Sequence, residues 1–263
     1  MENAFCMGLG QDDSNMGEVV AVQAAPAEAT LALVCEHASN RFPAAMDFLG
    51  LPPNLRDSHI AWDPGALAVA QAMAAQLNAP LVAGCVSRLV YDCNRPPEAP
   101  DAVPERSEVF DIPGNTGLSA EARAARAEHV YHPFRARLAS EIAQRRGALK
   151  ALVTMHSFTP VYRGVPRAVQ IGILHGTDSR LADAMLAAPP DCGYDIRRNA
   201  PYDASDGVLH TLDVHAIPNG LLNVMIEVRN DLIATAADQR AMGALLAGWV
   251  DRALRQSLRG VAA

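Results

Sequence analysis

The feature that most constrains the fold is a succession of short apolar runs that alternate with helix-like segments. The runs span 30–35, 81–86, 149–155, 168–174 and 221–226, and a further short strand is expected at 193–197. The helical patterns span 66–77, 119–146, 178–187 and 235–254. Short continuous apolar runs are typical of strands buried on both faces. Their alternation with helices predicts a mainly parallel or mixed central sheet covered on both faces, a three-layer α/β/α fold.

The chain is expected to contain one domain. Residues 1–28 show no clear periodicity, so we expect a loose N-terminal leader ahead of a single domain at 29–263. Asp63 and Pro64 are expected to cap the helix at 66–77. Residues 96–117 contain five prolines and two glycines. A loop of this length in a compact domain is commonly functional, and we expect it to set substrate choice.

Composition excludes several classes of protein. Half of the 263 residues are hydrophobic, which excludes a disordered chain. The formal net charge of -7 disfavours nucleic-acid binding. No apolar run reaches the ~18 residues that a membrane span needs. The five scattered cysteines without a CxxC pair, and an N-terminus unlike a signal peptide, predict reduced thiols in a cytoplasmic protein. The sequence leaves the oligomeric state open.

Three of the expected strands end in residues that commonly carry chemistry. His37 follows the first strand closely, His156 follows the strand at 149–155, and Glu227 follows the last strand. In an open parallel sheet, ligands bind beyond the carboxyl ends of the strands, so these side chains are expected to converge. Asp63 opens a helix a short way after the first strand and supplies a fourth group.

Two histidines and one carboxylate are the usual protein ligands of a catalytic zinc. Such a metal lowers the pKa of bound water and polarises a carbonyl, while a non-ligating carboxylate such as Glu227 passes the proton. Each residue also has a plain structural interpretation: Asp63 as a helix cap, the histidines as hydrogen-bonded core residues, and Glu227 as a partner of Arg229. There is no HExxH or HxxE motif, so spacing alone is a weak indication of a metal.

Five segments, in order, resemble the N-formylglutamate amidohydrolase family. They read VCEHASN at 34–40, AWDPGA at 61–66, SRLVYDCNRP at 87–96, MHSF at 155–158 and IEVRNDLI at 226–233. The third and fifth are the most specific, and the similarity extends over roughly 33–233. The resemblance implies a single α/β domain related to zinc carboxypeptidases and zinc-dependent muramoyl amidases.

The resemblance also implies a metal site. It assigns zinc to His37, Asp63 and His156, with Glu227 as general base and acid. Asp63 stands where the muramoyl amidases have a longer glutamate, and Glu36 is the competing carboxylate. Adjacent residues of a strand point to opposite faces, which argues against Glu36 and His37 sharing one metal. Another divalent ion would suit the same ligands.

The substrate that names the family is a formylated amino dicarboxylate, a small acidic molecule, so cationic anchors are expected. Arginine binds carboxylates through two parallel hydrogen bonds. Arg88 and Arg95 are assigned to the substrate, and Arg229, which faces the same side of its strand as Glu227, to catalysis. The alternative is that Arg88 or Arg95 pairs with Asp92 and braces the loop. The remaining substrate-binding candidates are Asn94, Asn199, Tyr202 and His215.

The expected activity is hydrolysis of an N-formyl amino acid, most simply N-formyl-L-glutamate to formate and L-glutamate, a step of histidine or amino-acid catabolism. One alternative is a zinc amidase of the same fold that acts on another N-acyl amino acid or a peptide-like amide. A second is a non-catalytic protein that binds a metal or a small acid. Catalysis by Cys35 is disfavoured, because no helix N-terminus beside it would lower its pKa.

Overall fold

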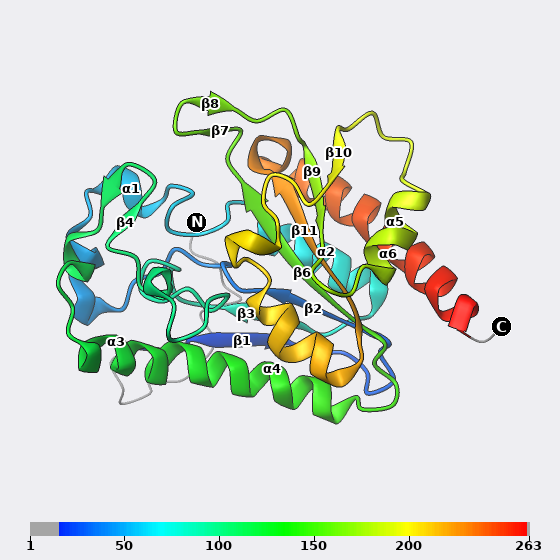
Figure 1. Ribbon diagram of the computed structural model, residues 1–263, viewed down its shortest axis with the longest axis horizontal. Coiled ribbons are helices and arrows are strands. Elements are labelled where there is room, and N and C mark those ends of the chain that lie inside the picture. The colour runs from blue at the N-terminus through cyan, green and yellow to red at the C-terminus, as the bar shows by residue number, and fades with distance from the viewer. Residues whose placement is uncertain (1–15, 262–263) are drawn as a thin grey trace.

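A computed structural model describes residues 16–261, with side chains to residue 259. A seven-stranded sheet with the order β1-β3-β2-β6-β11-β9-β10 forms its centre (Figure 1). The four central strands are parallel, whereas β1 is antiparallel to β3 and β9 is antiparallel to β11. The expected mixed, mainly parallel sheet is therefore confirmed. The strands are β1 (Val20–Gln23), β2 (Leu31–Cys35), β3 (Leu81–Gly84), β6 (Ala151–Phe158), β9 (Ile171–Leu174), β10 (Ile196–Arg198) and β11 (Leu222–Arg229).

Helices cover both faces of the sheet. α2 (Ala66–Leu77), α5 (Arg180–Ala187) and α6 (Ala236–Val261) pack on one face, and α3 (Ala120–Arg126) and α4 (His132–Gln144) lie on the other, with α1 (Pro53–Arg56) to one side. Alternate strand residues enter the two cores: Leu33 and Cys35 face α2, and Val34 belongs to the core that contains α4. No helix in the described residues is long and apolar enough to span a membrane.

The helix expected at 119–146 is divided by a π-helical turn at Ala127–Tyr131. Pro133, near the start of α4, has no N–H to give to the carbonyl four residues earlier. The backbone widens by one residue there, and His132 N–H bonds to the Ala127 carbonyl. The amphipathic pattern continues through this turn, so periodicity alone does not reveal it.

The expectation of a loose leader over 1–28 is wrong at Val20–Gln23. These residues form β1, which pairs with β3 in the register Val20 to Gly84. A four-residue edge strand is too short to give a recognisable periodicity. Residues 1–15 of the expected leader lie outside the described residues.

The expectation of five reduced thiols is also wrong. Cys35, Cys93 and Cys192 are free, but Cys85, which directly follows β3, is disulfide-bonded. An odd number of widely spaced cysteines contains no pairing pattern that the sequence alone could reveal.

Two small hairpins stand beside the carboxyl ends of the parallel strands. The long loop at 96–117 contains β4 (Arg106–Ser107) and β5 (Phe110–Asp111). After β6 the chain forms β7 (Val161–Tyr162) and β8 (Val165–Pro166), which project at the top of Figure 1. The hairpins thus flank the edge of the sheet at which His156 and Glu227 lie, near the carboxyl ends of β6 and β11.

Candidate active site and metal centre

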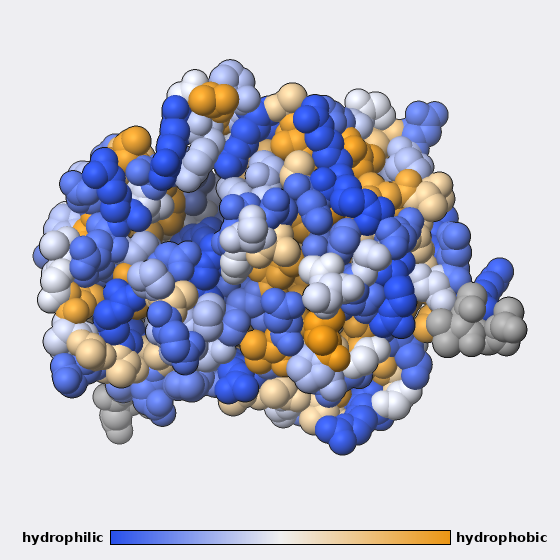
Figure 2. Space-filling model, in the orientation of Figure 1, coloured by the Kyte–Doolittle hydropathy of each residue, from blue (hydrophilic) through white to orange (hydrophobic). Residues whose placement is uncertain are grey.

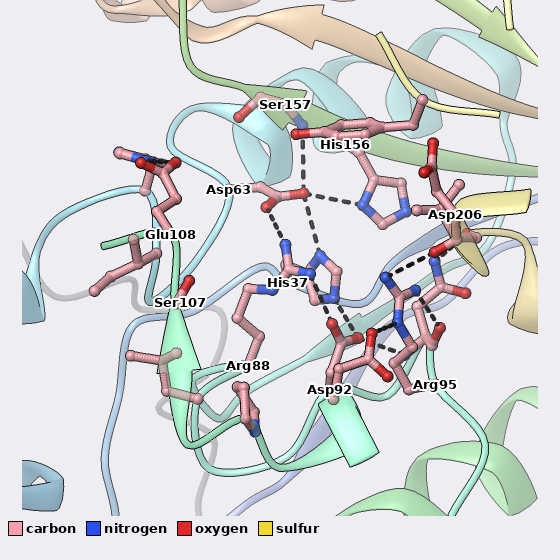
Figure 3. A pocket seen from close by; sticks show the side chains of 18 of the residues that line it. His37, Asp63, Arg88, Asp92, Arg95, Ser107, Glu108, His156, Ser157 and Asp206 are labelled. Carbon is pink, nitrogen blue, oxygen red and sulfur yellow. Dashed lines mark hydrogen bonds and ion pairs between the residues drawn. The ribbon is translucent and has the colours of Figure 1, made fainter. Parts of the chain in front are cut away.

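A cavity of 430 Å³ opens at the carboxyl ends of the parallel strands. In Figure 2 the molecule is hollowed beneath the β7–β8 hairpin, and the surface there is largely hydrophilic. The long loop contributes residues from Asp101 to Glu108 to its wall, and the β7–β8 hairpin contributes Tyr162 and Arg163. The cavity floor contains His37, Asp63 and His156 (Figure 3). Glu227 also lines the cavity.

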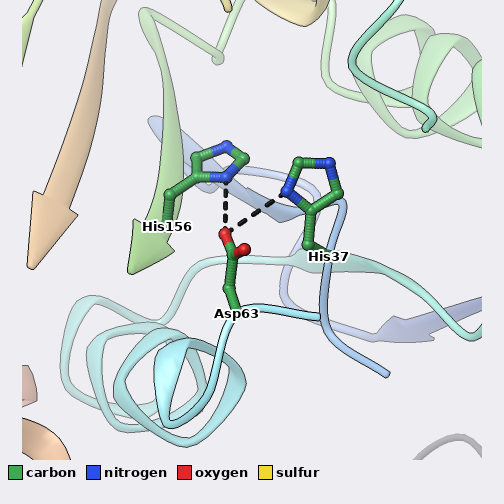
Figure 4. Close-up of side chains that lie close together, drawn as sticks. All are labelled: His37, Asp63 and His156. Atoms are coloured by element: carbon green, nitrogen blue, oxygen red, sulfur yellow. Dashed lines mark hydrogen bonds and ion pairs between the residues drawn. The ribbon is translucent and has the colours of Figure 1, made fainter. Parts of the chain in front are cut away.

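Three of these residues form a compact buried group. Asp63 Oδ2 lies 2.9 Å from His156 Nδ1 and 3.3 Å from His37 Nδ1 (Figure 4). All three are at most 3% exposed, and one ligand atom from each lies within 4.8 Å of the others. The donor set of two imidazoles and a carboxylate therefore suits a divalent metal such as zinc.

The turn before α2 places Asp63 in this group. The N-cap of α2 is Gly65, at a φ of 83°, and no side chain caps the helix, so the predicted cap at Asp63 is wrong. The Asp63 N–H donates to the His37 carbonyl at 3.0 Å, which holds the two segments together. A Cβ on Gly65 would lie 2.7 Å from the Ile233 carbonyl, so the turn requires glycine.

Glu227 lies beside the group. It is the Cα partner of His156 in the parallel register of β6 and β11. Its Oε2 is buried and makes no hydrogen bond within the described residues. Burial, together with the nearby charge of Asp63, raises the pKa of Glu227 to about 7. A carboxyl with this pKa exchanges protons readily near neutral pH.

Ionised partners surround the two histidines. Burial opposes the charge of Asp63, but His37 and the hydrogen bond from His156 hold its pKa well below the usual range. Burial likewise opposes the protonation of His156, yet Glu36 and Asp63 raise its pKa well above the usual value. Asp63 is therefore ionised, and a divalent cation bound between the imidazoles would take the place of their protons, because a metal ligand must be deprotonated.

Arg88, Asn94 and Arg95 line the cavity, but their polar groups are already engaged. Arg88 donates to Asp92 Oδ2 at 2.7 Å, so the alternative of a bracing pair is observed for this residue. Arg95 donates to Asp101 and to the Gly207 carbonyl, both at 2.7 Å. The Asn94 amide bonds to the loop backbone, where it donates to the Val208 carbonyl and accepts from Thr211 N–H.

Tyr202 lines the cavity with its hydroxyl proton available. Arg167 donates to the phenol oxygen at 3.0 Å, which leaves the Tyr202 O–H as a donor. Burial raises the pKa of Tyr202 to about 12, so the phenol keeps its proton at neutral pH. Such a donor suits an oxygen that gains negative charge during a reaction.

The structure does not bring three of the predicted residues into the cavity. Arg229 donates to Asp231 at 2.8 Å and to the Arg167 carbonyl at 3.0 Å. Asn199 Oδ1 accepts from the backbone N–H of His175 at 3.0 Å. His215 lines a separate groove of 420 Å³ between α4 and residues 214–219. Arg229 is the last residue of β11, and Asn199 and His215 lie in turns, whose geometry periodicity does not reveal.

Four residues near the site were not among the catalytic, substrate-binding and metal-binding residues assigned from the sequence, which gave Glu36 only as a competing carboxylate and Asp92 only as an alternative partner of Arg88 or Arg95. Asp92 Oδ1 lies 2.7 Å from His37 Nε2, and its position within SRLVYDCNRP was the available signal. Glu36 lies 3.2 Å from His156 Nε2. Ser157 N–H donates to Asp63 Oδ2 at 3.3 Å. Arg163 lines the cavity without a carboxylate partner among the described residues. Its guanidinium makes a cation–π contact with the Tyr162 ring.

Cys35 lies in the core between the sheet and α2 and does not line the cavity. It is fully buried on the face of the sheet that α2 covers, and burial raises the pKa of its thiol well above the usual value. A thiol in this setting is a poor nucleophile.

Comparisons with known proteins connect this geometry to a family. The sequence model of N-formylglutamate amidohydrolase matches residues 29–234. The structure of gene product Atu2144 from Agrobacterium tumefaciens shares 52% identity and a TM-score of 0.88, over 91% of this chain and 96% of that one. An N-formylglutamate amidohydrolase from Ralstonia eutropha JMP134 has the same fold, with 19% identity and a TM-score of 0.62 over 92% and 99% of the two chains. None of the curated proteins matches the chain.

Proposed function

Since the chain belongs to the N-formylglutamate amidohydrolase family, whose members hydrolyse a carbon–nitrogen amide bond, we propose that it converts N-formyl-L-glutamate to formate and L-glutamate with the help of a divalent metal, zinc in the first instance. One observation carries the proposal. A buried His-Asp-His group and a buried glutamate of raised pKa line one cavity.

His37, Asp63 and His156 would hold the metal through the two Nδ1 atoms and a carboxylate oxygen. The fit rests on the position of Asp63 Oδ2, which already lies within hydrogen-bonding distance of both ring nitrogens. A bound divalent ion supplies two effects, acidification of water and polarisation of the amide carbonyl.

Glu227 is the proposed proton carrier. Ionised, it accepts a proton from the attacking water, whose oxygen forms a bond to the formyl carbon. The C–N bond then breaks, and Glu227 returns the proton to the leaving nitrogen, which yields formate and the free amine. Because no described residue donates a hydrogen bond to Glu227 Oε2, a proton can bind there without breaking an existing hydrogen bond.

Of the residues in the cavity wall, Tyr202 and Arg163 would contact the substrate, and the others would support the site. The Tyr202 O–H, which the hydrogen bond from Arg167 leaves available, would donate to the carbonyl oxygen as that oxygen gains charge. Arg88 is tied to Asp92 and orients that carboxylate, and Arg95 and Asn94 brace the loop at 206–211. Arg163 is the cavity arginine without a carboxylate partner among the described residues, so it is free to bind a substrate carboxylate.

The test is a substrate panel on the metal-loaded protein and on Glu227→Gln. The panel contains formyl-, acetyl- and succinyl-L-glutamate together with neutral formyl amino acids, and formate or amine release is measured. Release of formate from formyl-glutamate by the wild type alone supports the proposal. Turnover of a different amide would redirect the assignment to another amidase of this fold. Stoichiometric metal binding without any turnover would favour a binding protein.

A further inference from the structure

Glu36 is a buried carboxylate next to the site to which the proposed reaction gives no role. It follows β2 and is 2% exposed. It stands two residues beyond Val34, as His156 stands two beyond Thr154, the register partner of Val34. Glu36, His156 and Glu227 therefore form one row across three adjacent strands. Gly84 makes room for this arrangement, because a Cβ there would collide with the Glu36 carbonyl.

The contacts of Glu36 are few. Its Oε2 lies 3.2 Å from His156 Nε2, but neither carboxylate oxygen makes a well-aligned hydrogen bond to any described residue. His156 Nε2 also lacks an aligned partner, whereas Nδ1 of the same ring faces Asp63 at 2.9 Å. Burial opposes the charge of Glu36, but His156, with His37 and the Thr211 hydroxyl, lowers its pKa, so the carboxylate is ionised. A buried ion pair of this kind is often no more stabilising than apolar side chains in its place. A purely structural role therefore explains Glu36 poorly.

Asp92 provides an internal comparison. His37 turns Nδ1 to Asp63 and Nε2 to Asp92 Oδ1 at 2.7 Å, so both histidines present the same nitrogen to Asp63 and the other to a second carboxylate. Asp92 is further stabilised by Arg88 and by the Asn94 N–H. Glu36 has no arginine or lysine ion pair among the described residues, and its cationic partner is His156.

We infer that Glu36 is a positioning residue for the metal centre: it accepts the Nε2–H of His156 and thereby fixes Nδ1 as the nitrogen that faces the metal. A ligating imidazole commonly donates its other N–H to a carboxylate, which sets its tautomer and orientation and strengthens it as a ligand. The inference rests on the metal centre in the proposed function but not on the identity of the substrate.

The experiment measures zinc affinity by chelator competition, without any substrate, for wild type, Glu36→Gln and Glu36→Leu. Gln keeps an acceptor of nearly the same shape, whereas Leu removes it. Loss of such a partner typically weakens metal affinity by about 10- to 100-fold, which is the change expected for Leu, with a smaller loss for Gln. Thr154→Val is the matched control, since it removes a neighbouring buried hydroxyl that has no hydrogen-bond partner among the described residues and leaves both ring nitrogens of His156 untouched.

Nitrogen NMR of the zinc-loaded wild type supplies a readout that does not depend on variant folding. The inference predicts that His156 carries its proton on Nε2. A proton on Nδ1, or a folded Glu36→Leu protein with wild-type zinc affinity, would overturn it. A wild type that binds zinc but hydrolyses no formyl amino acid would refute the proposed substrate and leave this inference standing. A wild type that binds no metal would refute both.

Discussion

Glu227 and His156 are direct neighbours on adjacent parallel strands, with paired Cα positions and side chains on the same face of the sheet. The pairing fixes the proposed proton carrier beside a proposed metal ligand through backbone hydrogen bonds. Sites built on strands hold their geometry better than sites built on loops. The proposed catalytic arrangement thus follows from strand register, and the loops around it would define the substrate.

The first prediction concerns Glu227→Gln. The variant should keep one metal per chain but lose roughly 10²- to 10⁴-fold in kcat, because the amide cannot accept the proton from water. Metal content and formate release are measured on the same sample. If the variant loses its metal as well, Glu227 acts as a ligand and the assigned role is wrong.

The second prediction concerns the pH dependence of the reaction. Burial raises the pKa of Glu227 to about 7, and only its ionised form can accept a proton. We expect kcat/KM of the metal-loaded enzyme to fall with unit slope as the pH decreases. The midpoint should lie below about 7, because the positive charge of the bound cation favours the carboxylate. The profile from pH 4 to 9 checks this. An activity that rises as the pH falls through this range would contradict the role of Glu227.

The third prediction concerns the stability of the metal-free protein. Because the pKa of Glu227 is raised in the folded state, its stabilising contribution is present below its unfolded value, 4.5, and is lost as the pH rises through about 7. A shift of this size corresponds to about 3 kcal/mol. In urea unfolding, the free energy of unfolding of Glu227→Gln relative to that of the wild type should therefore increase between pH 5 and pH 8. An equal difference at both pH values would refute this account.

The fourth prediction concerns Gly65. Alanine there forces a Cβ onto the Ile233 carbonyl at a positive φ, so we expect a loss of about 2–4 kcal/mol in stability together with weaker metal binding, because Asp63 is displaced. Gly117→Ala is the control, since it has a φ of 67° but open space around the added atom. Its cost should be about 1 kcal/mol, with metal affinity unchanged. Equal effects of the two substitutions would argue against the close turn.

The fifth prediction concerns Arg163. Alanine should raise KM for formyl-glutamate by about tenfold, corresponding to the loss of one charge-assisted contact, and leave KM for a neutral formyl amino acid unchanged. Arg106→Ala is the matched control, because that exposed cavity arginine already pairs with Asp111. Parallel KM changes for acidic and neutral substrates would exclude Arg163 as a carboxylate anchor.

The strand ends could be predicted from the sequence because buried strands are recognisable as apolar runs and their carboxyl ends meet at one edge. The positions of His37, His156 and Glu227 follow from this rule. Asp63 was expected as a helix cap and as a candidate ligand, and only the Gly65 turn shows that its side chain faces the histidines.

Other predicted site residues could not be placed in the same way. Arg229 and Asn199 have the right chemistry but bond to neighbouring backbone and side-chain groups outside the cavity. Glu36 shows the reverse case. Its alternation with His37 argued against a shared metal, yet the same alternation places its side chain beside His156 on the next strand. Contacts between segments that are far apart in the sequence decide where the side chains of Arg229, Asn199 and Glu36 lie, and spacing along the chain does not encode these contacts.

The most direct test of the central claim is a titration of zinc into the metal-stripped protein, with formate release from N-formyl-L-glutamate as the readout. We predict that the rate rises linearly and reaches its plateau at one zinc per chain, and that His156→Ala shows no such rise. Full activity in the stripped protein, or no formate at any zinc content, would contradict the claim that His37, Asp63 and His156 hold a catalytic metal for this reaction.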